Sequence, residues 1–488
     1  MKIITKYPDD IIQNNNMNRI LAPLLLLSFM LIPFDDLPYL TQLSGVGRRA
    51  AMYPFFIIIP IITFMSLKKF KFYFKLSIEK ICLLLFYLWT IVSIAVNIPN
   101  ILNNFYKGES GISKAIIHLI TLTFVILIAY CTEIILLRSK ITLFNIRTAI
   151  LLSIIPVSIV SSIEIINLLA FYDLSNILEK ITYIFNLTLR GYVYGGRARG
   201  VSAEASYLGM YCAFVFPWII SYLYTEENKL KKVLFTLLSA FILLVVIATK
   251  SRTATILILF ELVSLFGLIL LFYKNIKFKI YTFIFVIICY CLLMIYPKAL
   301  ITIMDKNTKP QITTPSETPE KPSTEYEVGS LVSSVTDNSN LSNIARSSMQ
   351  NAAIKMAIDN PIFGVGLGEF GFNVSPYVDD KYLVSHEVQV WLDDNNPAWP
   401  PVHSLYHRVV SEMGFVGLIF YFVFIFIICL KLLIKIIKSK NDLFGIFLLI
   451  SYSSIIIGSL TIDTLLLTHF WLMTAVVTVY NNNKLNVS

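Results

Sequence analysis

Arginines stand at the ends of two apolar segments, where they could meet a phosphate group. Arg197 and Arg199 come just before the apolar segment that starts near residue 204, and Arg252 precedes the one that starts near residue 254. Arginine stays charged and presents a planar fork of donors that suits phosphate oxygens. Arginine at the end of a membrane span can also simply extend its charge to lipid headgroups. The pattern therefore allows either a phosphate site or an interfacial anchor.

Two histidines lie four positions apart where a long polar segment meets an apolar one. Imidazole accepts a proton near neutral pH, so His403 is a candidate general base. If the stretch is helical, His403 and His407 face the same way, and such a pair can also bind a metal. The intervening Ser-Leu-Tyr supplies no acid, and no Asp-x-Asp pair occurs in the chain. We therefore expect no metal site and no metal-dependent transferase.

An acid and a run of glycines complete the candidate set. Glu204 follows Arg199 by five residues, and it can orient an arginine or serve only as a negative charge at a helix N-terminus. No strand pattern precedes Gly364, Gly366 and Gly368, as a dinucleotide fingerprint requires. We expect them to turn the backbone tightly beside a substrate.

The composition places these residues in a membrane protein. Hydrophobic residues make up 56% of the 488 and charged residues only 14%, and the mean hydropathy is +0.72. A helix needs about 20 mostly apolar residues to cross the bilayer with its backbone groups paired. We predict an all-α polytopic membrane protein with about twelve such helices, roughly at 20–34, 50–67, 77–97, 114–136, 148–171, 204–224, 233–249, 254–273, 280–297, 409–430, 443–461 and 462–480.

Basic residues follow every second predicted span, as in Lys68 to Lys75, Lys229 to Lys232 and Lys431 to Lys440. By the positive-inside rule these connections and both termini are expected to be cytoplasmic. The net charge of +10 is then mostly a topology signal, and we expect no nucleic-acid partner. No cleavable signal peptide is expected, because the first apolar stretch follows a polar N-terminal segment and no small-residue cleavage site comes after it.

Three regions follow from this pattern. Residues 1–297 hold nine spans with short loops and an arginine-rich outer segment near 172–203. Residues 298–408 form one large outer loop, in which 305–340 is rich in Pro, Ser, Thr and Glu and is predicted to be flexible. Its second part resumes with the helical pattern IARSSMQNAAIKMAID. Residues 409–488 hold the last three spans and a cytoplasmic tail.

Four motifs in one order resemble the O-antigen polymerase and ligase superfamily: RARGVSAEASYLGMY, ATKSRTATI, MAIDNPIFGVGLGEF and VHSLYHRVVSEMGFVGLIFYFVF. The resemblance implies a GT-C-like membrane glycosyltransferase of the bacterial inner membrane, with no cofactor and its active site on the periplasmic side. It implies undecaprenyl-diphosphate-linked glycans as donor and acceptor. It also implies Arg199 and Arg252 as diphosphate ligands, and it marks Glu204. We further predict His403 as the base and Arg197 as a secondary residue that binds either the diphosphate or lipid headgroups. Tyr406, His407 and Gly366, with Glu204, are the predicted substrate-binding or orienting residues. Ser404 departs from the family pattern, which usually has Asn there.

Two activities of this family remain open, and we favour a polymerase that extends a lipid-linked glycan by moving it onto the next lipid-linked repeat unit. The alternative is a ligase that moves the finished glycan to lipid A core or to a protein. A transporter of lipid-linked oligosaccharides is less favoured, because the charges gather at span ends and no internal repeat is visible. Membrane lipids and a chain-length regulator protein are the expected further partners.

Overall fold

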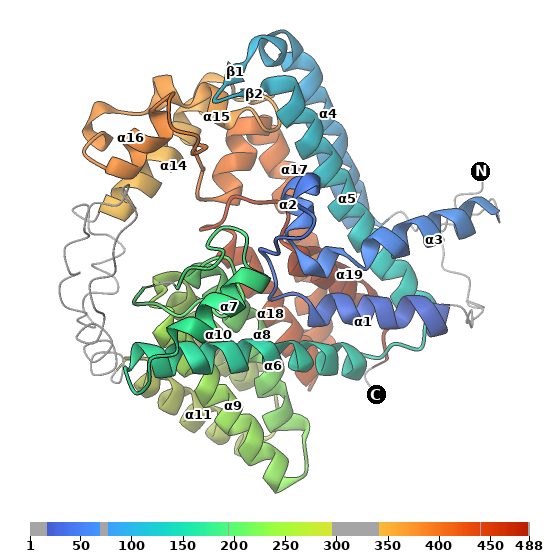
Figure 1. Cartoon of the computed structure of the whole chain (residues 1–488). Helices are drawn as coiled ribbons and strands as arrows, with labels where there is room; N and C mark the ends of the chain where they lie inside the picture. The colour runs from blue at the N-terminus through green and yellow to red at the C-terminus, as the bar shows by residue number, and fades with distance from the viewer. Residues whose placement is uncertain (1–16, 69–76, 194, 295–340, 440, 487–488) are drawn as a thin grey trace.

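The chain is an all-α polytopic membrane protein (Figure 1). The computed structural model describes residues 17–68, 77–193, 195–294, 341–439 and 441–486. Within these ranges nine helical segments are long and apolar enough to cross a membrane. They are α3 (Phe55–Lys68, with the 3-10 turn Ala50–Met52 before it), α4 (Ile78–Asn103), α5 (Gly111–Arg138), α6 (Leu143–Leu168), α8 (Ala205–Thr225), α9 (Lys229–Ala248), α10 (Arg252–Phe272), α11 (Ile276–Met294) and α17 (Leu405–Ser439).

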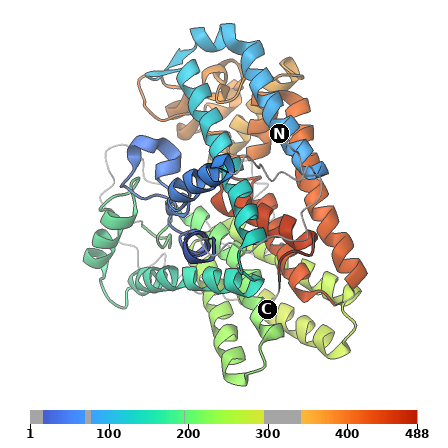
Figure 2. The same ribbon diagram turned by 90° about the vertical axis from the view of Figure 1, so that its right-hand side faces the viewer.

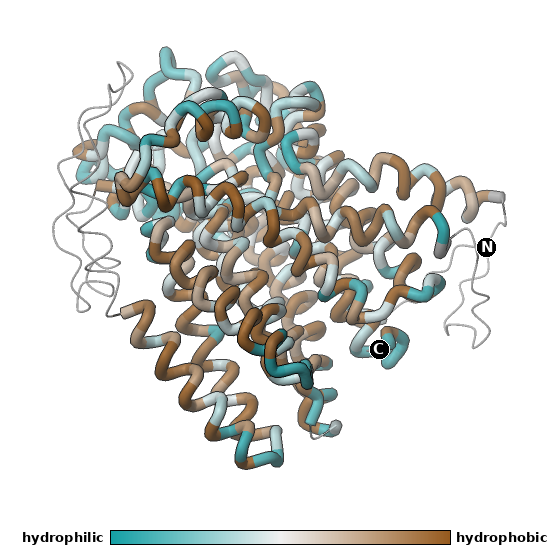
Figure 3. The backbone as a smooth tube through the Cα atoms, turned by 60° about the horizontal axis from the view of Figure 1, so that its bottom comes forward, coloured by the Kyte–Doolittle hydropathy of each residue, from teal (hydrophilic) through white to brown (hydrophobic). Residues whose placement is uncertain are grey.

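The other three predicted spans are shorter helices. They are α1 (Ala22–Met30), which follows a π-helical turn at Met17–Leu21, α18 (Leu443–Gly458) and α19 (Thr468–Asn481). Each has fewer residues than the roughly 20 that cross a bilayer unaided. Each of the twelve predicted spans thus contains a helix within the described residues. Figure 3 shows hydrophobic colour running along the helices, with hydrophilic colour mostly at their ends and connections.

The helices pack around α8, which is buried along almost its whole length. Its neighbours are α9, α10 and α18, while α5 packs on α19. Helix α4 lies along α17, as Figure 2 also shows. One hydrophobic core runs through this bundle.

Helix α17 begins four residues earlier than the predicted span and is interrupted inside. Gly414 has φ 69° and ψ −179°, which breaks the helix there. A left-handed φ suits glycine because it has no Cβ. The close approach of the chain also requires glycine: the amide of Phe415 donates to the carbonyl of Pro361 at 2.8 Å, and a Cβ on Gly414 would collide with the backbone of Ile362.

A smaller polar part caps one end of the bundle. It contains α14 (Leu341–Asp359), α15 (Phe370–Asn373), α16 (His386–Leu392) and the 3-10 turns Ser375–Tyr377 and Asp380–Tyr382. These elements share a second core in which Ala345, Met349, Ala353 and Met356 of α14 pack on Phe370 and Val388. The antiparallel hairpin of β1 (Phe105–Tyr106) and β2 (Glu109–Ser110), between α4 and α5, lies against this cap. We call this end of the bundle the cap side.

The remaining short elements are α2 (Ser44–Gly47), the 3-10 turn Thr41–Leu43 and α7 (Ser175–Phe185), which lies in the predicted arginine-rich segment. The flexible stretch predicted at 305–340 lies outside the described residues.

Candidate active site

Arg252 is the first residue of α10. The Ser251 hydroxyl caps this helix by accepting from the Ala254 amide at 3.4 Å. Helix N-termini carry partial positive charge and unpaired amides, so they favour anions. The Arg252 guanidinium adds a full positive charge to the partial positive charge at the N-terminus of α10. Two like charges so placed favour the binding of an anion there.

Helix α14 connects Arg252 with His403. The Arg252 Nη2 donates to Asn343 Oδ1 at 3.0 Å, and seven residues later Gln350 Nε2 donates to the His403 carbonyl at 3.2 Å. Residues spaced by three, four and seven share one face of a helix. That face also holds Arg346, one turn after Asn343.

Arg346 is a cation that sits among other charges. It keeps more than a third of its surface open to solvent. The protein packed around the guanidinium lowers its pKa, and the charges of Arg252 and Arg197 lower it further, whereas Glu387 and Glu204 raise it. Three arginines therefore act on the same space, from the connection before α8, from α10 and from α14.

His403 lies on the connection that leads into α17, in a left-handed backbone conformation with φ 59°. Such a φ is unusual for a residue other than glycine and tends to occur at functional sites. Asp463 Oδ2 accepts from the adjacent Val402 amide at 2.7 Å, and the Trp391 ring lies 5.2 Å from the imidazole. Because α17 begins only at Leu405, the idea that His403 and His407 share a helical face is wrong.

The imidazole of His403 is held neutral. Burial lowers its pKa from 6.5 to about 4, the nearby Arg346 charge lowers it as well, and Asp463 opposes them. Its Nε2 is buried and has no hydrogen-bond partner among the described residues. A neutral imidazole with an unbound ring nitrogen can accept a proton from a hydroxyl.

The remaining residues of the first arginine motif divide between two places. Arg197 donates from Nε to the Thr249 carbonyl at 2.8 Å, just before α10, and its charge reaches Arg346. Glu204 is exposed at the N-cap of α8 and also acts on Arg346. These two therefore join the group around α14.

Arg199 lies elsewhere and has no exposed surface. Its guanidinium donates to the carbonyls of Tyr192 and Ala203, each at 3.4 Å. Its backbone amide and that of Gly200 donate to the buried carboxylate of Glu164 on α6. The cavity beside it has a volume of only about 10 Å³, about enough for one water molecule. Its role as a diphosphate ligand stays a prediction.

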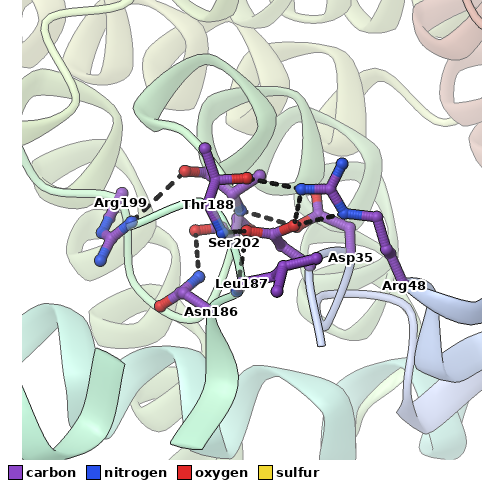
Figure 4. Close-up of polar contacts among 9 residues, drawn as sticks. Asp35, Arg48, Asn186, Leu187, Thr188, Arg199 and Ser202 are labelled. Carbon is purple, nitrogen blue, oxygen red and sulfur yellow. Dashed lines mark hydrogen bonds and ion pairs between the residues drawn. The ribbon is translucent and has the colours of Figure 1, made fainter. Parts of the chain in front are cut away.

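Figure 4 shows the polar contacts around Arg199. Asp36 accepts from the Thr188 amide at 2.8 Å and pairs with Arg48 at 2.7 Å, and Asp35 accepts from the Ala203 amide at 2.7 Å. These contacts fix both ends of the segment that carries the first arginine motif to the chain that follows α1.

Tyr406 and His407 occupy the first turn of α17. The Tyr406 hydroxyl donates to the Ile456 carbonyl of α18 at 2.6 Å, and its ring stacks on Phe422 at 4.9 Å. His407 Nδ1 shares a 2.8 Å hydrogen bond with the Ser404 hydroxyl. Both therefore brace the start of α17, and a contact of either with substrate stays a prediction.

The glycine run turns tightly, as expected, and it packs directly on helices α4 and α17. Gly364, Gly366 and Gly368 all have positive φ. The Gly366 amide donates to the Glu412 carbonyl at 2.9 Å, and a Cβ on Gly366 would press on Ile101 of α4. The run thus docks the cap onto α4 and α17, and a contact of Gly366 with substrate stays a prediction.

Sequence reasoning missed two residues at this site. Arg346 could have been noticed because it stands with Asn343 and Gln350 on the polar face of a helix whose other face is Ala and Met. Asp463 could have been noticed as a lone acid between two apolar helices. Its carbonyl also accepts from Arg408 Nη1 at 2.7 Å, so the connection from α18 to α19 holds the chain on both sides of His403.

Residues 237–422 match the family model described as O-antigen ligase. The matched segment contains Arg252, Arg346 and His403 and begins after Arg197 and Arg199. It supports the superfamily of O-antigen polymerases and ligases and, with it, a glycosyltransferase-like membrane enzyme of O-antigen assembly. The match is compatible with either branch. No curated protein matches the chain.

Proposed function

We propose that the protein is a polysaccharide polymerase that transfers an undecaprenyl-diphosphate-linked glycan onto the next lipid-linked repeat unit. One observation carries the proposal: helix α14 joins Arg252 to His403 and holds Arg346 between them. This arrangement puts cations for a departing diphosphate beside a neutral base for an acceptor hydroxyl.

The transfer requires one bond to form and one to break at the anomeric carbon. His403 Nε2 takes the proton of the acceptor hydroxyl as the acceptor oxygen bonds to the anomeric carbon. The bond from that carbon to the diphosphate oxygen breaks, and the electron pair leaves with the diphosphate. Arg252, Arg346 and Arg197 hold the charge that develops on this group, which is the interaction that lowers the barrier.

Binding of the donor tunes the base. A diphosphate beside Arg346 brings negative charge, which offsets the cation that lowers the His403 pKa. The imidazole therefore becomes a stronger base once the donor is bound. Asp463 favours the imidazolium that forms during transfer.

We place the cap side on the periplasmic face of the bacterial inner membrane, with both termini in the cytoplasm. The positive-inside rule supports this placement. The basic residues Arg138, Lys229, Lys231 and Lys274 lie in or beside the connections from α5 to α6, from α8 to α9 and from α10 to α11, at the helix ends away from the cap. A fusion reporter at residue 486 tests it, since a periplasm-dependent alkaline phosphatase should stay inactive there.

A ligase is the second candidate, because the matched family model is described as O-antigen ligase. A ligase uses the same donor and the same proton transfer, and it differs only in the acceptor. The two are separated by the product: repeated transfer gives a ladder of glycan lengths on the polyprenyl carrier, whereas ligation moves glycan to lipid A core or protein.

To test the proposal, the protein is expressed in a strain that lacks its own polymerase but makes the matching repeat unit. Wild type should give a multi-repeat ladder, and Arg252→Ala, Arg346→Ala and His403→Ala should abolish it. Lys355→Ala is the matched control, because Lys355 lies on the same helix as Arg346 and forms an exposed ion pair with Asp379, which contributes little to stability. Ladders from all three site variants at equal membrane levels would refute the site. Transfer of single repeats to core would establish the ligase.

A further inference from the structure

A second, larger cavity lies within the helices, far from His403. It has a volume of about 280 Å³ and is bounded by α4, α5, α17 and α19. Helix α4 contributes its first turns to the cavity, whereas it reaches the glycine run only later, where the Ser93 hydroxyl donates to the Phe363 carbonyl at 2.7 Å. The cavity is therefore at the end of the bundle opposite the cap.

Two ion pairs lie at one end of this cavity. Lys80 Nζ is 2.6 Å from Glu133 Oε1, and Lys431 pairs with Glu79. Both carboxylates are buried, with Glu79 3% and Glu133 6% exposed. Glu79 and Lys80 lie in the first turn of α4, and charged residues at the end of a span meet the headgroup region of the bilayer. Glu79, Lys80 and Glu133 line this polar end of the cavity. Lys431 adds a second positive charge as the ion-pair partner of Glu79.

The rest of the cavity is apolar and elongated. Its wall includes Leu83, Leu84, Ile126 and Leu127, and at the far end the hydroxyls of Tyr87 and Thr123 bond to each other at 2.9 Å. From Glu79 to Tyr87 the α4 wall covers eight residues, or about 12 Å at the helical rise per residue. That length approaches the roughly 15 Å of hydrocarbon in one leaflet.

Helix α4, which forms one wall of the cavity, is mostly exposed, with 22% of its apolar window buried. On this wall Leu84 lines the cavity and is 44% exposed. An empty apolar space loses the dispersion contacts that its walls would otherwise make. In a membrane the surrounding hydrocarbon can supply those contacts, so a lipid chain is the natural occupant.

We propose that this cavity binds one acyl chain of a zwitterionic phospholipid that carries a primary ammonium group. The chain lies between Glu79 and Tyr87, the phosphate meets Lys431 and Lys80, and the ammonium meets Glu79 and Glu133. Equal numbers of acidic and basic groups match a headgroup of both signs better than an anionic one, and an ammonium can donate hydrogen bonds to the carboxylates. The bound lipid would support the spacing of four helices, of which α4 and α17 hold the cap at their other ends.

The full-length protein should be purified from vesicles with equal amounts of phosphatidylethanolamine, phosphatidylcholine and phosphatidylglycerol and analysed by native mass spectrometry. Wild type should retain one phosphatidylethanolamine. Leu127→Trp should lower its occupancy by about tenfold, because the larger side chain occupies the cavity. Leu84→Trp at the lipid-facing rim should act in the same direction. The matched control is Leu85→Trp, since Leu85 is the next residue, is 39% exposed and does not line the cavity.

A charge variant tests the headgroup. Glu79→Gln leaves the lysines in excess, so the preference should shift from phosphatidylethanolamine toward phosphatidylglycerol. The proposal is overturned if occupancy survives both Leu127→Trp and Leu84→Trp, or if Leu85→Trp reduces it equally. Wild-type preference for phosphatidylglycerol or phosphatidylcholine, or an unchanged preference in Glu79→Gln, would also overturn it.

Discussion

Replacing Arg346 by glutamine should impair transfer in a way that depends on pH. Arg346 stands near both Arg252 and His403, so the substitution removes a cation from the diphosphate and also one influence on the base. At pH 7 the base is neutral in either protein, and only the first effect acts. Loss of one donor that stabilises developing negative charge costs about 10² to 10³ in rate.

The second effect appears on acidification. The His403 pKa is about 4 rather than 6.5, chiefly through burial and then through Arg346. Without that charge the pKa rises toward 6.5 but stays below it, because burial remains. In the variant without bound substrate, His403 is then protonated at a higher pH than in wild type, so the acid limb of kcat/KM shifts to higher pH. The loss of kcat/KM relative to wild type is therefore larger at pH 5 than at pH 7.

The assay follows glycan transfer between synthetic polyprenyl diphosphates by protein in proteoliposomes, with kcat/KM measured from pH 4.5 to 8. Arg346→Lys is the control, because it keeps the charge but loses the bidentate contact with phosphate. It should be slower than wild type with an unmoved acid limb. An Arg346→Gln variant with wild-type rate at pH 7, or with an acid limb at the wild-type pH, would refute the reasoning.

Three further predictions concern the supports of the site. Gly364→Ala should lower both the melting temperature and the activity, because its Cβ would collide with the backbone of Glu412. The control is Gly108→Ala, which has a similar positive φ and open space around it and should cost only the backbone strain. Equal melting temperatures of the two variants would contradict this. Asp463→Asn should lower the His403 pKa further, because the opposing negative charge is lost. The acid limb of kcat/KM should therefore lie at a lower pH than in wild type, and an acid limb at a higher pH would contradict this. Arg199→Ala should reduce the thermal stability in detergent by several degrees, because it empties a fully buried, hydrogen-bonded position; a fully stable but inactive variant would instead favour its direct contact with diphosphate.

Hydropathy alone located the helices well, because only a helix pairs all the backbone groups of a lipid-embedded segment. The start of α17 was harder to place, since Leu405 to Arg408 are too polar in pattern for a span and become helical by packing under the cap. The break at Gly414 depends on the close approach of Ile362, more than 50 residues earlier in the chain. No local pattern reveals such an approach.

The candidate site shows the same division. Residue chemistry made Arg252 and His403 candidates, because both stand where polar chain meets a span, and the family resemblance favoured Arg252 over an interfacial anchor. It gave no reason to select Arg346, whose importance arises only when α14 lies between α10 and the His403 connection. It also predicted Arg199 at an accessible helix end, whereas Glu164, 35 residues earlier in the chain, holds the backbone at this point and the side chain is buried.

The most direct test of the central claim is single-turnover transfer by the purified His403→Ala variant, with donor and acceptor saturating and donor binding measured separately. If His403 is the base beside the Arg252 and Arg346 cations, the chemical step should slow by about 10² to 10⁴ while donor affinity stays close to that of wild type. A His403→Ala protein that transfers at the wild-type rate would contradict the account.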